Sequence, residues 1–130
     1  MKFQIAASIL ILFYSCVPRD DDDCHSGIGV LNNTDQTIYL MIEDFDGTEL
    51  SCLLPRLEIP SEQQEELTGP STCWETRINQ TYEGSFVVSF LGTDPYADTC
   101  DSTELFNSVL EQRELTVEGL RRDGWVISFP

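Results

Sequence analysis

Few side chains in this sequence could act as a nucleophile or a base. Histidine occurs once, as His25, and lysine occurs once, as Lys2; no Gly-x-Ser-x-Gly nucleophile motif is present. Acyl transfer requires a nucleophile that is held beside a base, and few residues of this chain could supply that pair. His25 follows an acidic stretch that offers no fixed scaffold, so we predict an exposed loop histidine. No catalytic residue is assigned.

Carboxylates are abundant by contrast. The 130-residue chain has 23 Asp plus Glu against 7 Lys plus Arg, for a formal net charge of −16. Two carboxyls roughly 5–10 Å apart can hydrolyse a glycosidic bond, so a carboxylate-dependent enzyme acting on glycans is an alternative hypothesis. The negative charge disfavours binding to nucleic acids, because the protein repels their phosphate backbone.

One segment could hold a metal ion. Residues 43–49 contain three acidic side chains before Gly47 and one after it, and they resemble part of a calcium loop. They lack the third early ligand and the late Glu of an EF-hand. The Asp46-Gly47 pair is a hairpin-turn signal, so a turn is favoured. No metal site and no cofactor is predicted.

Cys16 ends a segment that is typical of a secretory signal. Lys2 supplies one positive charge, and residues 3–14 are almost entirely apolar. That length matches a signal-peptide core of about 7–15 residues and falls short of the roughly 20 residues of a membrane-spanning helix. We predict that residues 1–15 are a signal peptide and that residues 16–26 are a linker.

The segment Leu12–Cys16 resembles the lipobox of bacterial lipoproteins, where cleavage precedes a cysteine that becomes lipid-modified. Positions 13 and 14 hold bulky aromatic residues, as in the looser lipoboxes of Bacteroidota. The acidic run Asp20–Asp23 resembles the signal that sends such lipoproteins to the outer face of the outer membrane; it is also typical of a solvated linker. The resemblance implies membrane attachment through lipid on Cys16 and a surface-exposed envelope location.

The other cysteines indicate disulfides. Cys24, Cys52, Cys73 and Cys100 are an even set in a chain expected to be exported, which permits two bridges and three pairings. We favour Cys24–Cys52 with Cys73–Cys100. No C-x-x-C pair supports zinc.

Residues 27–130 are expected to form a single β-rich domain. Segments rich in β-branched and aromatic residues predict strands at 28–31, 37–43, 48–54, 72–79, 85–91 and 125–129. Residues 61–67 are expected to form a helical turn or a solvated loop. Helices are expected at 104–112 after an N-cap at Thr103, and at 117–123 between Thr116 and Gly124.

This order predicts a mainly β fold: an antiparallel β-sandwich or open sheet with one or two short C-terminal helices. The last strand should pair with a central earlier one. Trp74 and Trp125 are expected in the core, and Tyr82 and Tyr96 in turns, where they could form a recognition surface.

The C-terminal residues 113–130 resemble the ending of a group of short Bacteroidota lipoproteins of unknown function. That ending has Leu-Thr, a short charged helix, Trp, alternating apolar residues, an aromatic residue and Pro. Those chains also carry an early Asn-Asn-Ser/Thr-Asp segment, which residues 32–35 match. The resemblance implies a shared fold and a shared address, and it carries no activity.

The sequence therefore predicts a non-enzymatic surface lipoprotein with an unknown protein or glycan partner. Besides the enzyme hypothesis, a freely secreted, disulfide-stabilised binding domain is the second alternative. It predicts cleavage at another position and N-glycans at Asn32 or Asn79, which both begin Asn-x-Thr patterns.

Overall fold

The computed structural model describes residues 24–42, 56–69, 72–94 and 101–130. Several predictions lie outside these residues: the signal peptide 1–15, Cys16, the acidic run 20–23, the metal or hairpin segment 43–49, the strand 48–54, Cys52, Tyr96 and Cys100. Within the described residues, seven strands form two sheets and three helices are short. The predicted mainly β class is confirmed.

The smaller sheet is built around the first strand. β1 (Gly27–Asn32) lies between β4 (Gln64–Thr68), which is antiparallel to it, and β7 (Val126–Phe129), which is parallel to it. The predicted pairing of the last strand with a central earlier one is thereby confirmed. Ile28 and Val30 are fully buried because alternate residues of β1 face the core.

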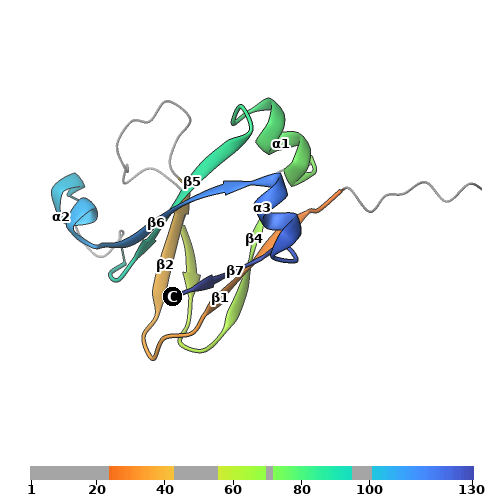
Figure 1. Cartoon of the computed structure of the whole chain (residues 1–130). Coiled ribbons are helices and arrows are strands. Elements are labelled where there is room, and N and C mark those ends of the chain that lie inside the picture. The colour runs from red at the N-terminus through yellow and green to blue at the C-terminus, as the bar shows by residue number, and fades with distance from the viewer. Residues whose placement is uncertain (1–23, 43–55, 70–71, 95–100) are drawn as a thin grey trace, which may run out of the picture.

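The larger sheet is antiparallel throughout. Its order is β3 (Arg56–Ile59), β2 (Ile38–Ile42), β5 (Ser85–Leu91) and β6 (Val109–Thr116). β5 lies between β2 and β6, as Figure 1 shows, and five of its seven residues are buried. Its inner residues Val88 and Phe90 are fully buried between the sheets.

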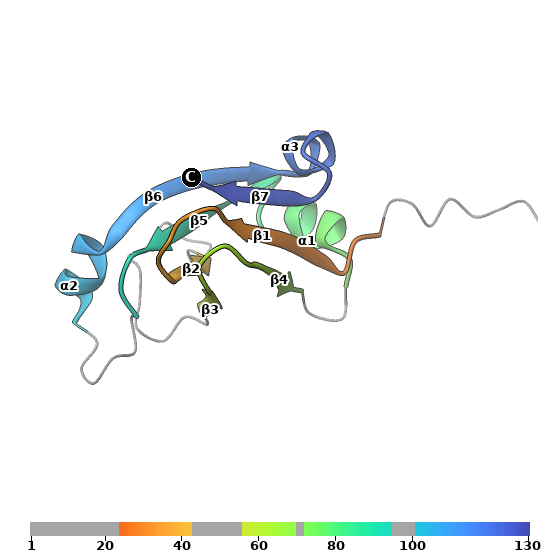
Figure 2. The ribbon, with the colours of Figure 1, turned by 90° about the horizontal axis from the view of Figure 1, so that it is seen from below.

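The two sheets meet on one side only. A tight turn joins β3 to β4, where the Gln63 N–H donates to the Pro60 carbonyl at 3.2 Å. On the opposite side β6 and β7 are the last strands of their sheets and do not pair with each other. Figure 2 shows β3 with β4 below and β6 with β7 above. The described strands thus surround the core except for one opening between β6 and β7.

The helices occupy two opposite ends. α1 (Trp74–Gln80) and α3 (Val117–Arg122) lie beside each other, near the first described residues. α2 (Ser102–Asn107) lies at the far end (Figures 1 and 2).

The predicted strand at 72–79 is wrong, because these residues form α1. Trp74 and Ile78 are four residues apart, a spacing that places them on one face of a helix and also on one face of a strand. Thr76 distinguishes the helix from the strand. In a strand, Thr76 would lie on the same buried face as Trp74 and Ile78. It is exposed, while Trp74 and Ile78 are buried.

The predicted helix at 104–112 is wrong in its second half. α2 begins after Asp101, whose carboxylate accepts the Thr103 N–H at 2.8 Å, and it ends before Ser108. The chain then continues as β6, which pairs with β5 along its length. The apolar residues of this segment have helical spacing, but from Val109 onward the pairing with β5 determines the conformation.

The segment 61–67 also differs from its prediction. It contains a turn and then most of β4, which pairs with β1. Its residues are mostly polar because β4 is an edge strand with one solvated face.

The prediction for α3 is confirmed at both ends. The Thr116 hydroxyl accepts the Gly119 N–H at 3.0 Å as an N-cap. At the other end the Gly124 N–H donates to the Arg121 carbonyl and the Trp125 N–H to the Leu120 carbonyl, which is a Schellman motif. Gly124 has a φ of +68°, the left-handed conformation that this motif requires.

Candidate functional site

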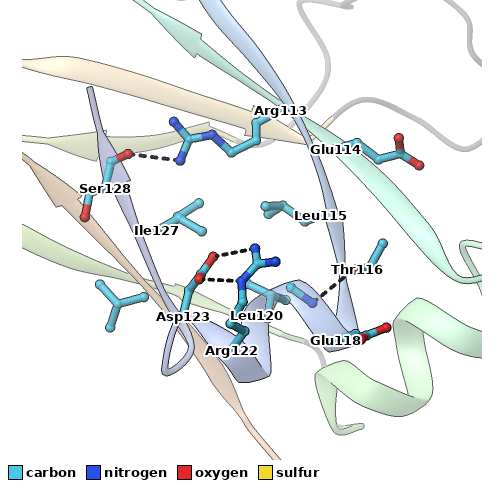
Figure 3. Close-up of a pocket in the computed structure, with 12 residues that line it drawn as sticks. Arg113, Glu114, Leu115, Thr116, Glu118, Leu120, Arg122, Asp123, Ile127 and Ser128 are labelled. Carbon is cyan, nitrogen blue, oxygen red and sulfur yellow. Dashed lines mark hydrogen bonds and ion pairs between the residues drawn. The ribbon is translucent and has the colours of Figure 1, made fainter.

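The opening between β6 and β7 contains a groove of about 780 Å³, closed at one end by α3. We call it the β6/β7 groove (Figure 3). Its lining residues are Arg113, Glu114, Leu115, Thr116, Glu118, Gly119, Leu120, Arg122, Asp123, Val126, Ile127 and Ser128. Its volume falls within the range of about 300–1,000 Å³ that is usual for ligand sites.

The groove lies between two strands of different sheets that α3 connects along the chain. β6 ends at Thr116, which is also the N-cap of α3. After α3 the chain reverses through Gly124 and Trp125, which both have positive φ angles. β7 then pairs with β1 and leaves its other edge toward β6.

Backbone groups of β7 face the groove. The carbonyls of Trp125 and Phe129 accept bonds from Gly29 and Asn33 on the β1 side, at 2.8 and 2.7 Å. Backbone groups of successive strand residues point to opposite sides, so those of Val126 and Ser128 point toward β6. This edge can therefore offer main-chain donors and acceptors to a ligand.

One side chain crosses the groove from β6 to β7. Arg113 donates from Nη1 to the Ser128 carbonyl at 3.0 Å. Its guanidinium also binds Glu111, from Nη2 at 2.5 Å, and lies 5.5 Å from the centre of the Phe90 ring. Figure 3 shows this bond opposite the α3 end. Arg113 thus limits the groove on the side away from α3.

The bottom of the groove is apolar and its margins are charged. Leu115, Leu120 and Ile127 belong to the main core and are almost fully buried. Three acidic residues and two arginines line it, but Figure 3 shows the carboxylates of Glu114 and Glu118 pointing away from the groove. Arg122 and Asp123 form an ion pair at 3.1 Å, and Asp123 raises the pKa of Arg122, first through this hydrogen bond and then through its charge.

A second cluster lies where the described chain begins. The His25 ring stacks on Trp125 with centroids 4.0 Å apart, and its Nδ1 lies 2.5 Å from Glu75 Oε1. The His25 backbone N–H donates to Glu75 Oε2 at 3.0 Å, and the Trp74 N–H donates to the His25 carbonyl at 2.8 Å. The expectation that His25 lacks a fixed scaffold is therefore wrong.

The environment of Glu75 favours its charged form. Burial alone would raise the pKa of this carboxyl, but hydrogen bonds from the His25 backbone and ring outweigh burial, and the pKa is lowered. An acidic residue that orients an imidazole is one part of a nucleophilic site. The neighbouring sulfurs of Cys24 and Cys73 cannot complete it, because they are joined in a disulfide.

That disulfide corrects the favoured pairing. Cys24 bonds to Cys73, so neither Cys24–Cys52 nor Cys73–Cys100 forms. The geometric reason is that Cys73 directly precedes α1, and the bond from the His25 N–H to Glu75 holds α1 against residues 24–26. Residues 24–26, which sequence reasoning assigned to the linker, all contact the domain.

The other predicted residues fall in different places. Trp74 and Trp125 are buried, as expected. Tyr82 is half-buried, and its hydroxyl accepts bonds from Arg77, so it packs as part of the α1 end. Asn32 is fully buried and Asn79 is exposed. A glycan could therefore be attached only to Asn79 of these two in the folded chain.

The groove could not be found from the sequence. Its residues come from consecutive elements, but the prediction of a helix through residue 112 concealed β6. Within the described ranges, no cluster of three metal-ligating side chains occurs. Among the same residues, no helix is long and apolar enough to cross a membrane.

Comparisons with protein-family models, with curated proteins and with solved structures give no match. Function is therefore inferred from the residues and geometry of this chain.

Proposed function

We propose that this chain is a lipid-anchored protein of the bacterial outer membrane, exposed at the cell surface, that binds a ligand in the β6/β7 groove without catalysing a reaction. The observation that carries the binding role is the groove, which combines strand edges, an apolar bottom and charged margins. These are the features of a recognition site. The anchor rests on the resemblance of Leu12–Cys16 to a lipobox.

The anchor is tested by the mass of the N-terminal peptide from the membrane fraction. A lipid-sized addition on Cys16, lost together with membrane association in Cys16→Ala, is the expected result. An unmodified N-terminus at another position would contradict the anchor and would favour the freely secreted alternative.

The binding role is tested with a matched pair of variants. Asp123 and Glu104 are both exposed acidic residues at the end of a short helix: Asp123 is the C-cap of α3, and Glu104 lies in the first turn of α2. Asp123→Trp places an indole at the α3 end of the groove (Figure 3), whereas Glu104→Trp places it at the opposite end of the molecule. Both proteins and the wild type are applied to arrays of glycans and peptides.

We expect a ligand whose binding is lost in Asp123→Trp and kept in Glu104→Trp. Equal binding by both variants would place the ligand elsewhere, and no binding by the wild type would contradict a binding role. Release of a cleaved glycan product by the wild type would instead support the carboxylate-dependent enzyme, which stays a prediction.

A further inference from the structure

The β6/β7 groove is short and closed at both ends. α3 closes one end, and the bond from Arg113 to the Ser128 carbonyl crosses the groove at the other, as Figure 3 shows. The volume of about 780 Å³ is that of a site for a small molecule. The ligand that fits is therefore compact and does not run through the groove as an extended chain.

The acidic residues that line the groove place little unpaired negative charge inside it. The carboxylates of Glu114 and Glu118 point away from the groove (Figure 3). Asp123 forms an ion pair with Arg122 at 3.1 Å, so these two charges offset each other. The whole chain has a net charge of −16, but charges more than about 8 Å away are largely screened at physiological ionic strength. A charged ligand in the groove therefore responds mainly to the side chains beside it.

Arg113 points into the groove, and its carboxylate partner Glu111 is not among the residues that line it. Nε and Nη2 both donate to the same Glu111 oxygen, at 3.0 and 2.5 Å, and Nη1 donates to the Ser128 carbonyl at 3.0 Å. Among the described residues these are its three hydrogen bonds, whereas a guanidinium has five N–H groups. One N–H of Nη1 and one of Nη2 can therefore bond a ligand.

A ligand can reach the Arg113 guanidinium without breaking a buried ion pair. The side chains of Arg113 and Glu111 are 32% and 36% exposed, and an ion pair in such a position contributes little free energy. The Phe90 ring lies 5.5 Å from the guanidinium and supports it from the core side. Hydrogen bonds from a guanidinium to a carboxylate are among the strongest in proteins. The geometry therefore favours a ligand that carries a carboxylate.

The edge of β7 offers two further polar groups. The Val126 carbonyl and the Ser128 N–H face β6, because backbone groups of alternate strand residues point to the same side. The other two groups on this side are occupied: the Val126 N–H donates to the Asp123 carbonyl at 3.4 Å, and the Ser128 carbonyl accepts from Arg113. One acceptor and one donor are left, and hydroxyl groups can bond to both.

We propose that the β6/β7 groove binds an acidic sugar, with the sugar carboxylate on Arg113 and sugar hydroxyl groups on the Val126 carbonyl and the Ser128 N–H. This inference rests on the proposed function and names the class of ligand. A neutral sugar would leave the Arg113 N–H groups without a partner, and an organic acid without hydroxyl groups would do the same to the β7 edge. An acidic sugar satisfies both.

The test uses the full chain as the cell processes it and ligands that differ at one group. Methyl glucuronide carries a carboxylate where methyl glucoside carries a hydroxymethyl group, and succinate has carboxylates without hydroxyl groups. Calorimetric titration measures the three affinities. We expect methyl glucuronide to bind at least about tenfold more tightly than either of the other two, and to protect the Ser128 amide from exchange.

Two arginine substitutions provide the matched comparison. Arg113→Gln and Arg121→Gln each remove one positive charge, but Arg121 lies on α3 and is not among the residues that line the groove. We expect affinity for methyl glucuronide to fall about tenfold in Arg113→Gln and to stay within about twofold in Arg121→Gln. Affinity for methyl glucoside should be similar in both variants.

Absence of methyl glucuronide binding to the wild type, or binding no tighter than that of methyl glucoside or succinate, would overturn the inference. This result does not depend on the folding of any variant. Equal affinity of Arg113→Gln and Arg121→Gln for the glucuronide would overturn it as well. If Asp123→Trp abolishes binding of a neutral glycan or a peptide while methyl glucuronide does not bind the wild type, the acidic-sugar inference fails and the proposed function stands. If Asp123→Trp affects no ligand, the groove itself is not the site.

Discussion

The His25 imidazole lies almost parallel to the Trp125 indole, with an interplanar angle of 13° and ring centroids 4.0 Å apart. The two residues stand a hundred positions apart in the chain, near its first described residue and at the end of α3. The Nδ1 atom of the same imidazole contacts the Glu75 carboxylate on α1. His25 therefore connects three segments: the residues before β1, α1, and the turn that leads into β7. The α3 end of the groove is therefore tied to the start of the domain.

Replacement of Glu75 by Gln should lower stability in a pH-dependent way. Folding lowers the pKa of Glu75 below its ordinary value of 4.5. The charged carboxylate therefore stabilises the fold at pH values above 4.5, and this stabilisation is lost as the pH falls through the lower pKa of the folded state. We expect a loss of about 1.5–3 kcal/mol at neutral pH. Urea unfolding, followed by tryptophan fluorescence, measures it.

The difference between wild type and Glu75→Gln should shrink as the pH falls below 4.5. Glu58→Gln, at an exposed position of β3, is the control and should change little. A difference that is constant across this acidic range would show that the Glu75 charge is not involved.

Removal of the disulfide should destabilise the domain without unfolding it. The bridge from Cys24 to Cys73 spans 49 positions of sequence, and its loss in a Cys24→Ala, Cys73→Ala variant should cost about 2–4 kcal/mol. A non-reducing digest of the wild type should contain one peptide pair joined through these two residues. A pair joined through Cys24 and Cys52 would contradict the described fold at α1.

A negative charge in place of the Asn32 amide should strongly destabilise the fold. Its amide nitrogen donates to the carbonyls of Gln36, Ile59 and Pro60, at 2.7, 3.0 and 3.1 Å. Asn32→Asp would place a carboxylate against these three carbonyls in a fully buried site, and we expect a loss of about 3–5 kcal/mol. Chemical denaturation compares it with Asn33→Asp next to it, which is exposed and should cost less than about 0.5 kcal/mol.

Two neighbouring residues of α2 should respond differently to truncation. Leu105 is 3% exposed and packs with Met41 and Leu91, so Leu105→Ala should cost about 2–3 kcal/mol. Phe106 is 69% exposed, and Phe106→Ala should change the free energy of unfolding by less than about 0.5 kcal/mol. Thermal unfolding of both variants measures this, and similar losses would favour the longer helix that the sequence suggested.

Strands with strong local signals were predictable from sequence. The β-branched and aromatic residues of β2 and β5 fit a pleated, buried surface, and the cap at Thr116 with the stop at Gly124 bounds α3. β4 and β6 could not be predicted in this way. Their residues are largely polar, and they become strands only because β1 and β5 offer edges to pair with.

The groove and the His25 cluster depend on contacts between distant residues. Nothing local to His25 indicates that Glu75 and Trp125 will enclose it, since they lie on α1 and after α3. The same reason explains the mistaken disulfide, because the partner of Cys24 follows from the position of α1. Periodicity alone does not distinguish a helix from a strand at α1, and the strand predicted there is wrong.

The disulfide also determines how the domain would respond to mechanical force. Tension applied to the chain ahead of Cys24 would pass through a covalent bond into Cys73 and α1 as well as into Gly27 and β1. β1 is the central strand of its sheet, and pulling on its end would otherwise separate it progressively from β4 and β7. Because the disulfide transfers part of this tension to α1, β1 would stay paired with β7, and the groove side of β7 would keep its position.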